Sequence, residues 1–208
     1  MNSSVRPFAP IAAEPDSLPT SLPDLLGEVW SRTESGLNGR WPPWALPILA
    51  THSPEGPRAR VLALRSVEPA KRRFVFHTDA RSSKISEVQA DARVSLLFWD
   101  PGDAIEARFN GVATVHCRDD IARTAWQTVS PLRRMASAIA LTPAAVLDGQ
   151  ARFDSLPATD DDEVALEHFA VVHVTATGLD WLWLGPRDMR RAMIRWSPAG
   201  YSATWVAP

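Results

Sequence analysis

Residues 58–84 constrain the fold most strongly, because their periodicity changes within a short distance. Residues 60–67 and 73–78 alternate side chains with a period of two, which predicts two β-strands. The intervening Glu68-Pro69-Ala70-Lys71 has the proline and the charges of a hairpin connection. After Thr78 the apolar spacing becomes helical, so this stretch predicts a β-hairpin that leads into a short helix.

The start of that helix is chemically suited to an anion. Ser82 and Ser83 are typical N-cap residues, and Arg81 and Lys84 beside them are cationic. The first backbone N–H groups of a helix lack partners within it, and the helix dipole favours negative charge there. The hydroxyls of Ser82, Ser83 and Thr78 add donors. We therefore expect a phosphate or carboxylate site, although each residue taken singly is better explained as a solvated strand edge or an ordinary cap.

The rest of the chain predicts a mainly β, α+β fold. Besides the hairpin and its short helix, we expect helices at 21–36, 119–129 and 131–140, and strands at 44–51, 92–99, 104–115, 167–177, 179–184, 192–196 and 202–206. Gly178 and Asp180 are read as a turn between two of these strands. Sequential antiparallel strands with short turns favour a barrel or a sandwich. We expect a flexible arm at 1–20, one domain over 21–208, and a loop at 142–163 that lacks periodicity.

Composition argues against several classes of protein. A net charge of −2 and a pI near 6.2 give no general attraction to nucleic acid or to acidic membranes. No apolar run is long enough to span a bilayer, and the N-terminus lacks the order of a signal peptide. The single Cys117 permits no intramolecular disulfide, so a cytoplasmic location is expected. The acidic residues 160–163 are expected to be solvated, and no metal is assigned.

The order of motifs in residues 60–84 resembles a known family. Arg60 opens the run R-V-L-A-L-R, the hairpin follows, and F-V-F-H-T-D and R-S-S-K complete the pattern. This run resembles the flavin-binding core of the pyridoxamine 5′-phosphate oxidase family, whose members are FMN-binding split β-barrels. Trp181, Arg187 and Arg191, in the order W-x5-R-x3-R, resemble that family's C-terminal flavin and substrate motif. The resemblance implies an antiparallel split β-barrel with flanking helices, FMN as cofactor, and a homodimer with its FMN sites at the subunit interface.

The resemblance also implies which residues surround the flavin. Those implied to bind FMN are Arg60, Val61, Leu62, Arg65, His77, Thr78, Ser82, Ser83, Lys84, Glu106, Trp181 and Arg191. Lys84 and Arg60 would pair with the phosphate, Glu106 stands where the family has a glutamine at the pyrimidine edge, and Trp181 and Arg191 would come from a second subunit. Arg65 and Arg187 would contact a small-molecule substrate. Because Arg60 and Arg65 are five residues apart, both reach one cofactor only if the strand bends or bulges.

The substrate residues of the family are only partly present. Its Arg-x-His appears here as Arg-Asp-Met at 187–189, and its Tyr…Arg…Ser set is replaced by Thr124, Trp126, Thr128 and Ser130. The resemblance therefore implies an FMN-dependent oxidoreductase with an altered substrate pocket, and no catalytic residue is assigned. Two alternatives stay open. One is a non-catalytic flavin- or haem-binding module on the same barrel, and the other is a true pyridoxamine 5′-phosphate oxidase with a rebuilt phosphate pocket.

Overall fold

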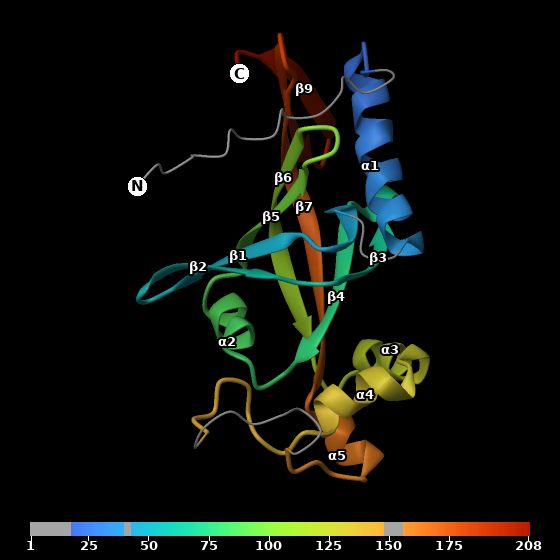
Figure 1. The fold of residues 1–208 in the computed structure, drawn as a ribbon, viewed down its shortest axis with the longest axis vertical. Helices are drawn as coiled ribbons and strands as arrows, with labels where there is room; N and C mark the ends of the chain where they lie inside the picture. Colours follow the sequence, from blue (N-terminus) through green and yellow to red (C-terminus); the bar gives the residue numbers. More distant parts are fainter. Residues whose placement is uncertain (1–17, 40–42, 148–155) are drawn as a thin grey trace, which may run out of the picture.

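The computed structural model describes residues 18–39, 43–147 and 156–208 (Figure 1). Most of the predicted arm at 1–20 and part of the predicted loop at 142–163 lie outside these residues. The α-helices of the described part are α1 (Leu22–Asn38), α2 (Ser83–Ala90), α3 (Asp120–Thr128), α4 (Pro131–Ala138) and α5 (Asp162–Glu167), and short 3-10 helices span Pro43–Ala45 and Pro69–Lys71. The strands are β1 (Ile48–Ser53), β2 (Gly56–Val61), β3 (Leu64–Glu68), β4 (Arg73–Asp79), β5 (Arg93–Asp100), β6 (Ile105–His116), β7 (Phe169–Leu184), β8 (Met189–Ser197) and β9 (Gly200–Val206).

All nine strands of the described part form one antiparallel sheet, which confirms the predicted mainly β, α+β class. The order is β2-β1-β5-β6-β7-β4-β3, with β8 added to β7 and β9 to β8. The two ends of this path, β2 and β3, are consecutive in the sequence and are joined by Leu62 and Ala63. The sheet must therefore curl until its two edges meet at this junction without pairing, which is a split barrel.

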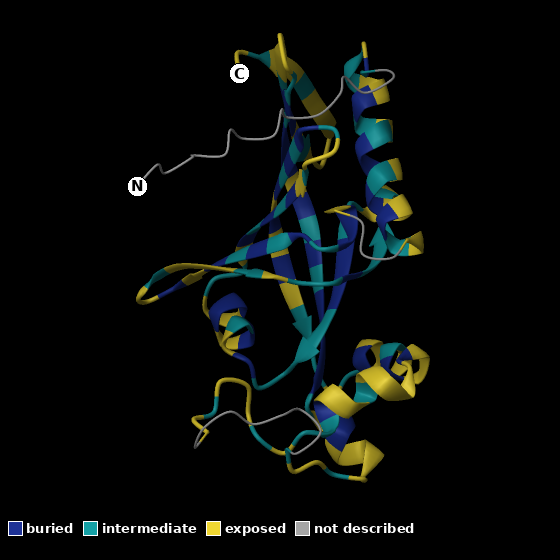
Figure 2. Ribbon diagram, viewed as in Figure 1, coloured by how far each residue is buried: buried dark blue, intermediate teal, exposed yellow. Residues whose placement is uncertain are grey.

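Aromatic side chains fill the inside of the curled sheet. Phe74 of β4, Phe98 of β5 and Phe109 of β6 are fully buried and pack at centroid distances of 4.8 to 5.9 Å. Trp30 of α1 stacks on Phe74 at 5.3 Å, so this helix covers one side of the sheet (Figures 1 and 2). Ser21 begins α1 by accepting a hydrogen bond from the backbone N–H of Asp24 at 3.2 Å.

A second, smaller core lies at the opposite end of β7 from β8. Helices α3, α4 and α5 gather there (Figure 1), and Trp126 of α3 packs on Phe169 at 5.1 Å. Arg134 of α4 lies 4.7 Å above the Trp126 ring and bonds Asp162 of α5 at 3.1 Å, which ties the three helices together. The predicted helices at 119–129 and 131–140 are confirmed, whereas α5 was not predicted: it begins within the predicted loop and runs to Glu167, where a strand was predicted to begin.

The predicted continuous strand at 60–67 is wrong. β2 ends at Val61 and β3 begins at Leu64, because the two strands pair with different neighbours, β1 and β4. The first barrel strand also begins later than predicted. Trp44 lies in a 3-10 helix, where its ring stacks on Phe98 at 5.4 Å and its Nε1 donates to Asp100 at 2.8 Å.

The predicted turn at Gly178 is wrong as well. β7 runs unbroken through this position, but it carries a bulge beside it: the consecutive residues Asn110 and Gly111 of β6 pair with Gly178 and Ala176, so Thr177 of β7 is the extra residue at this register shift. The backbones approach closely at this shift, because a Cβ on Gly111 would lie 2.6 Å from the carbonyl oxygen of Thr175. None of the helices in the described ranges is long and apolar enough to cross a membrane.

Candidate functional site

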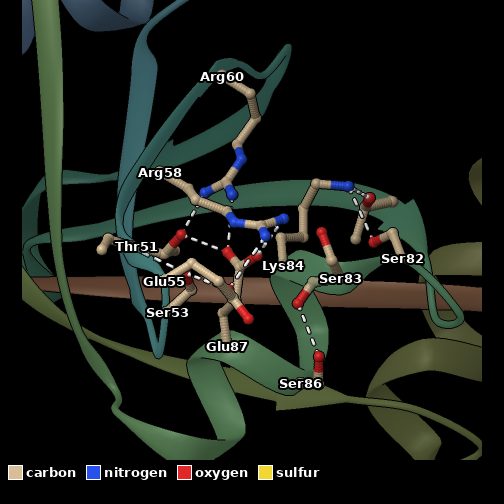
Figure 3. Close-up of polar contacts among 12 residues, drawn as sticks. Thr51, Ser53, Glu55, Arg58, Arg60, Ser82, Ser83, Lys84, Ser86 and Glu87 are labelled. Carbon is tan, nitrogen blue, oxygen red and sulfur yellow. Dashed lines mark hydrogen bonds and ion pairs between the residues drawn. The ribbon is translucent and has the colours of Figure 1, made fainter. Parts of the chain in front are cut away.

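The residues of the predicted anion site lie together where β4 ends and α2 begins. Lys84 Nζ donates to Thr78 Oγ1 and to Ser82 Oγ, both at 2.9 Å (Figure 3). Ser82 is the N-cap of α2, but its hydroxyl donates to the carbonyl of Asp79 at 2.8 Å and caps no helical N–H. The Ile85 N–H donates to the Ser82 carbonyl at 2.9 Å, so the N–H groups of Ser83 and Lys84 before it are the ones available to an anion.

Arg60 joins this site from β2. Its Nη2 lies 2.7 Å from Glu87 Oε2, and its Nη1 donates to Thr51 Oγ1 (Figure 3). Thr51 donates to the same Glu87 oxygen at 2.5 Å. We call Arg60, Thr78, Ser82, Ser83 and Lys84 the anion cradle. Sequence reasoning missed Thr51 and Glu87, although Glu87 follows Ser83 by four residues and so shares its helix face.

Glu87 is a buried carboxylate that fixes the Arg60 side chain. It is 6% exposed. Burial acts to raise its pKa, but hydrogen bonds from Thr51 and Arg60 outweigh burial and hold the pKa below the ordinary value. Glu87 is therefore charged at neutral pH, and the Arg60 guanidinium is held in place before any ligand arrives.

The cradle carries more positive than negative charge. Burial and then the nearby charge of Arg60 lower the pKa of Lys84, so the two cations repel one another. Arg58 adds a third cation 3.7 Å from Glu87, although its own closer partner is Glu55 at 3.1 Å. An anion between Arg60 and Lys84 would relieve this repulsion.

Arg65 and His77 lie elsewhere. Adjacent residues of a strand face opposite sides, so His77 points away from the side of β4 on which Thr78 meets Lys84. Both Arg65 and His77 line a cavity of about 500 Å³ between the sheet and α3, which we call the helix–sheet pocket. Its other lining residues are Ser66, Glu68, Val75, Asp120, Ile121, Thr124, Ala125, Thr128, Val171 and His173. The prediction grouped His77 with the cradle residues, but the structure places it on the opposite side of β4 from the anion cradle.

The helix–sheet pocket holds neutral histidines beside cationic arginines. Burial and then the charges of Arg65 and Arg133 lower the pKa of His77 to about 4. Burial and the charge of His116 likewise lower the pKa of His173 to about 4. Both imidazoles are neutral at pH 7, and each can donate one hydrogen bond and accept another. Sequence reasoning identified neither Arg133 nor His173.

Arg191 and Glu106 lie in neither the anion cradle nor the helix–sheet pocket, but on the outward face of β6, β7 and β8. Asp180 is 7% exposed and accepts bonds from Arg191 Nε at 2.9 Å, from Arg191 Nη2 at 2.8 Å and from Arg108 Nη2. Hydrogen bonds from Arg191 hold the pKa of Asp180 below its ordinary value. Glu106 pairs in register with Leu182, which in turn pairs with Arg191. Asp180, predicted as a turn residue, is therefore the centre of a charged cluster within a strand.

The remaining predicted residues do not join the cradle. Trp181 lies in the core at 2% exposure, with Trp205 at a centroid distance of 6.4 Å, because its strand is covered on that side. Leu62 packs partly against the same core, and Val61 is 59% exposed. Arg187 is exposed in the connection between β7 and β8.

Part of this chain is similar in sequence to known proteins. Residues 46–156, more than half of the chain, match the family described as pyridoxamine 5′-phosphate oxidase. A curated pyridoxine/pyridoxamine 5′-phosphate oxidase of Granulibacter bethesdensis is 50% identical over 69 residues, which cover 31% of this chain and 32% of the relative. The match therefore spans only about a third of that relative's length.

Two solved structures share the fold over nearly the whole chain. A pyridoxamine 5′-phosphate oxidase-related, FMN-binding protein of Nostoc punctiforme superposes with a TM-score of 0.71 at 20% identity, covering 92% of this chain and 100% of that one. PhzG of Burkholderia lata, in complex with tetrahydrophenazine-1-carboxylic acid, gives a TM-score of 0.68 at 20% identity, with 94% and 100% coverage. Together with the match over residues 46–156, these likenesses establish that the chain belongs to the pyridoxamine 5′-phosphate oxidase-like, FMN-binding family.

Proposed function

We propose that this chain binds FMN through the anion cradle and acts as an FMN-dependent oxidoreductase. The observation that carries the proposal is the convergence of Arg60 and Lys84 on the uncapped start of α2. These residues fit a phosphate, since it would accept bonds from two cations, from the hydroxyls of Thr78 and Ser83 and from free backbone N–H groups. FMN, when bound, supplies hydride or electron transfer.

In this proposal the residues of the chain bind and orient the cofactor and the substrate. Glu87 and Thr51 hold Arg60 in position, so little side-chain entropy is lost when the phosphate binds. The helix–sheet pocket supports the role of substrate site, since its volume of about 500 Å³ lies in the range of small-molecule pockets. Neutral His77 and His173 would contribute hydrogen bonds there without adding charge.

The relatives support an oxidase rather than a non-catalytic module. The curated relative is an oxidase of pyridoxine and pyridoxamine 5′-phosphate, and PhzG has been solved with a tetrahydrophenazine carboxylic acid. Pyridoxamine 5′-phosphate is therefore one substrate to test, alongside reduced nicotinamides and other small molecules. We place the protein in the cytoplasm, because its single cysteine gives it no structural use for an oxidising compartment.

We further propose that the chain forms a homodimer through the outward face of the sheet. Leu96 and Phe98 of β5 point into the core and are fully buried, so the alternating residues point outward. On this outward face Trp99 is 41%, Val112 44% and Val61 59% exposed. Exposed apolar side chains bordered by polar ones, here Glu106 and Arg108 of β6, are typical of an interaction site.

The cofactor proposal is tested by FMN binding, followed by fluorescence quenching. Replacing Arg60 and Lys84 together by Ala removes two charge-assisted bonds, and we expect the Kd for FMN to rise by about 100-fold or more. The control is Arg123→Ala, because Arg123 is an exposed residue of α3 and belongs neither to the cradle nor to the outward face of the sheet. An unchanged Kd in the double variant contradicts the cradle assignment.

Turnover is tested on the FMN-loaded protein. Oxygen consumption with pyridoxamine 5′-phosphate would identify a true oxidase of that substrate, and flavin reduction by a reduced nicotinamide or another small molecule would identify a different oxidoreductase. Bound FMN that none of these compounds reduces argues for the non-catalytic module.

The dimer is tested by sedimentation velocity. Trp99→Asp places a charge on the outward face, and we expect it to produce monomers. Val164→Asp serves as the control, because Val164 of α5 is comparably exposed, at 38%, but lies at the other end of the molecule (Figure 1). A Trp99→Asp protein that sediments as the parent does would rule out this face as the interface.

A further inference from the structure

Arg65 occupies an irregular position in its strand. In the pairing of β3 with β4, Leu64 lies opposite Phe76 and Ser66 lies opposite Val75, so Arg65 is the extra residue of a β-bulge. A bulge turns its side chain away from the direction that regular alternation would give. The Nε of Arg65 is buried and has no hydrogen-bond partner, which for a charged group costs free energy unless a ligand satisfies it.

A second arginine lies beside Arg65. Arg133 of α4 and Arg65 line a cavity of about 300 Å³, whose other lining residues are Gly36, Leu37, Gly39, Ala45, Ala63 and Leu64. None of these residues carries a carboxylate, in contrast to the surroundings of Arg60 and Arg191, which bond Glu87 and Asp180. Burial and then the charge of Arg133 lower the pKa of Arg65, as expected for neighbouring cations without an anion between them.

This cavity adjoins the helix–sheet pocket, since Arg65 lines both. The wall of the helix–sheet pocket includes the apolar side chains of Val75, Ile121 and Val171. Arg133 lines the smaller cavity together with Arg65, and Arg65 is the residue that the two cavities share. The helix–sheet pocket also carries the carboxylates of Glu68 and Asp120, whereas the charged residues that line the smaller cavity are the two arginines. The two cavities together therefore offer a partly apolar compartment whose end at the arginines is positively charged.

We propose that Arg65 and Arg133 bind the carboxylate of a small organic acid whose apolar body occupies the helix–sheet pocket. That this acid is the substrate rests on the proposed function, whereas its binding does not require FMN. A carboxylate suits this end better than a phosphate does, because the cavity shared by the arginines has no hydroxyl in its lining. The anion cradle, in contrast, provides the hydroxyls of Thr78 and Ser83 and a helix start. Planar guanidinium groups match the two oxygens of a carboxylate.

The experiment uses para-fluorobenzoate as the probe and follows its binding by fluorine NMR, with and without FMN. We expect Arg133→Gln and Arg65→Gln each to weaken binding by about tenfold or more. Arg133 is exposed, so its replacement should leave the fold intact and keeps the test valid if Arg65→Gln unfolds. The control is Arg123→Gln, which removes an exposed arginine of α3 outside both cavities and should bind as the parent does.

Three comparisons decide the outcome. Replacing Arg60 and Lys84 by Ala should leave probe binding unchanged, and loss of binding there would move the carboxylate to the cradle and overturn the inference. Tighter binding of para-fluorophenyl phosphate, or equal binding of neutral para-fluorobenzyl alcohol, would also overturn it. Probe binding that depends on Arg65 and Arg133 in a protein that binds no FMN would support the inference while refuting the proposed function.

Discussion

The pKa of His77 makes the folded protein sensitive to acid in a defined range. The unfolded chain takes up a proton as pH falls through 6.5, whereas the folded chain keeps His77 neutral down to about 4. The folded-state pKa is lowered, so stability is lost as pH falls between these two values. For a shift of this size the loss reaches about 2 kcal/mol near pH 5. Because the ring keeps some contact with solvent, we expect about 1 to 2 kcal/mol.

His77→Gln removes this titration and is measured by urea unfolding at pH 7 and at pH 5. The parent should lose about 1 to 2 kcal/mol more between the two pH values than the variant does. The difference between pH values is compared, because the variant also loses the contact of His77 with Phe169, at 4.9 Å, at both of them. The control, His52→Gln, removes an exposed histidine of β1 outside the pocket and should keep the parent's pH dependence. An equal loss in the parent and in His77→Gln would refute the reasoning.

Two further substitutions test the site and the sheet. Glu87→Gln removes the charge that fixes Arg60, so the free energy of unfolding in urea should fall by about 1 to 3 kcal/mol and the Kd for FMN should rise. Unchanged values of both would mean that Arg60 needs no carboxylate. Gly111→Ala should lower the free energy of unfolding by about 1 to 3 kcal/mol, because its Cβ would lie 2.6 Å from the Thr175 carbonyl oxygen. In Gly27→Ala of α1 the added Cβ would meet nothing within 4 Å, so this variant should be neutral or stabilising. Equal unfolding free energies for the two alanine variants would contradict the close approach.

Local periodicity predicted the strands whose neighbours do not change along their length. β4, β5 and β6 begin and end within a few residues of the predicted positions, since each keeps one face in the core throughout. The prediction failed at Leu62 and Ala63 and again at Gly178. At the first position the chain leaves one edge of the sheet for the other, and at the second β7 continues through a bulge at Thr177 in its pairing with β6. Both events depend on partners far away in the sequence, which alternation cannot report.

The candidate site divides in the same way. Thr78, Ser82, Ser83 and Lys84 could be predicted together because they lie within seven consecutive residues. His77 was assigned with them although it neighbours Thr78 in a strand, and that adjacency alone predicts the opposite face.

The residues that sequence reasoning missed come from other elements. Thr51 of β1 and Arg133 of α4 reach their sites only through tertiary packing, so no local pattern marks them. The bulge at Arg65 was predicted only indirectly. A bend or bulge was needed if Arg60 and Arg65, five residues apart, were to reach one cofactor.

The split of the barrel also bears on how the protein avoids aggregation. The edges of β2 and β3 do not pair with each other, so each leaves backbone groups open to a strand from another chain. β2 carries Pro57, Arg58 and Arg60 along its length, and β3 is interrupted by the bulge at Arg65. Proline, charge and bulges are the features that discourage pairing between edges. Arg60, which is proposed to hold the phosphate, therefore also protects the open edge of β2, and a variant that removes it should be checked for fibrils as well as for binding.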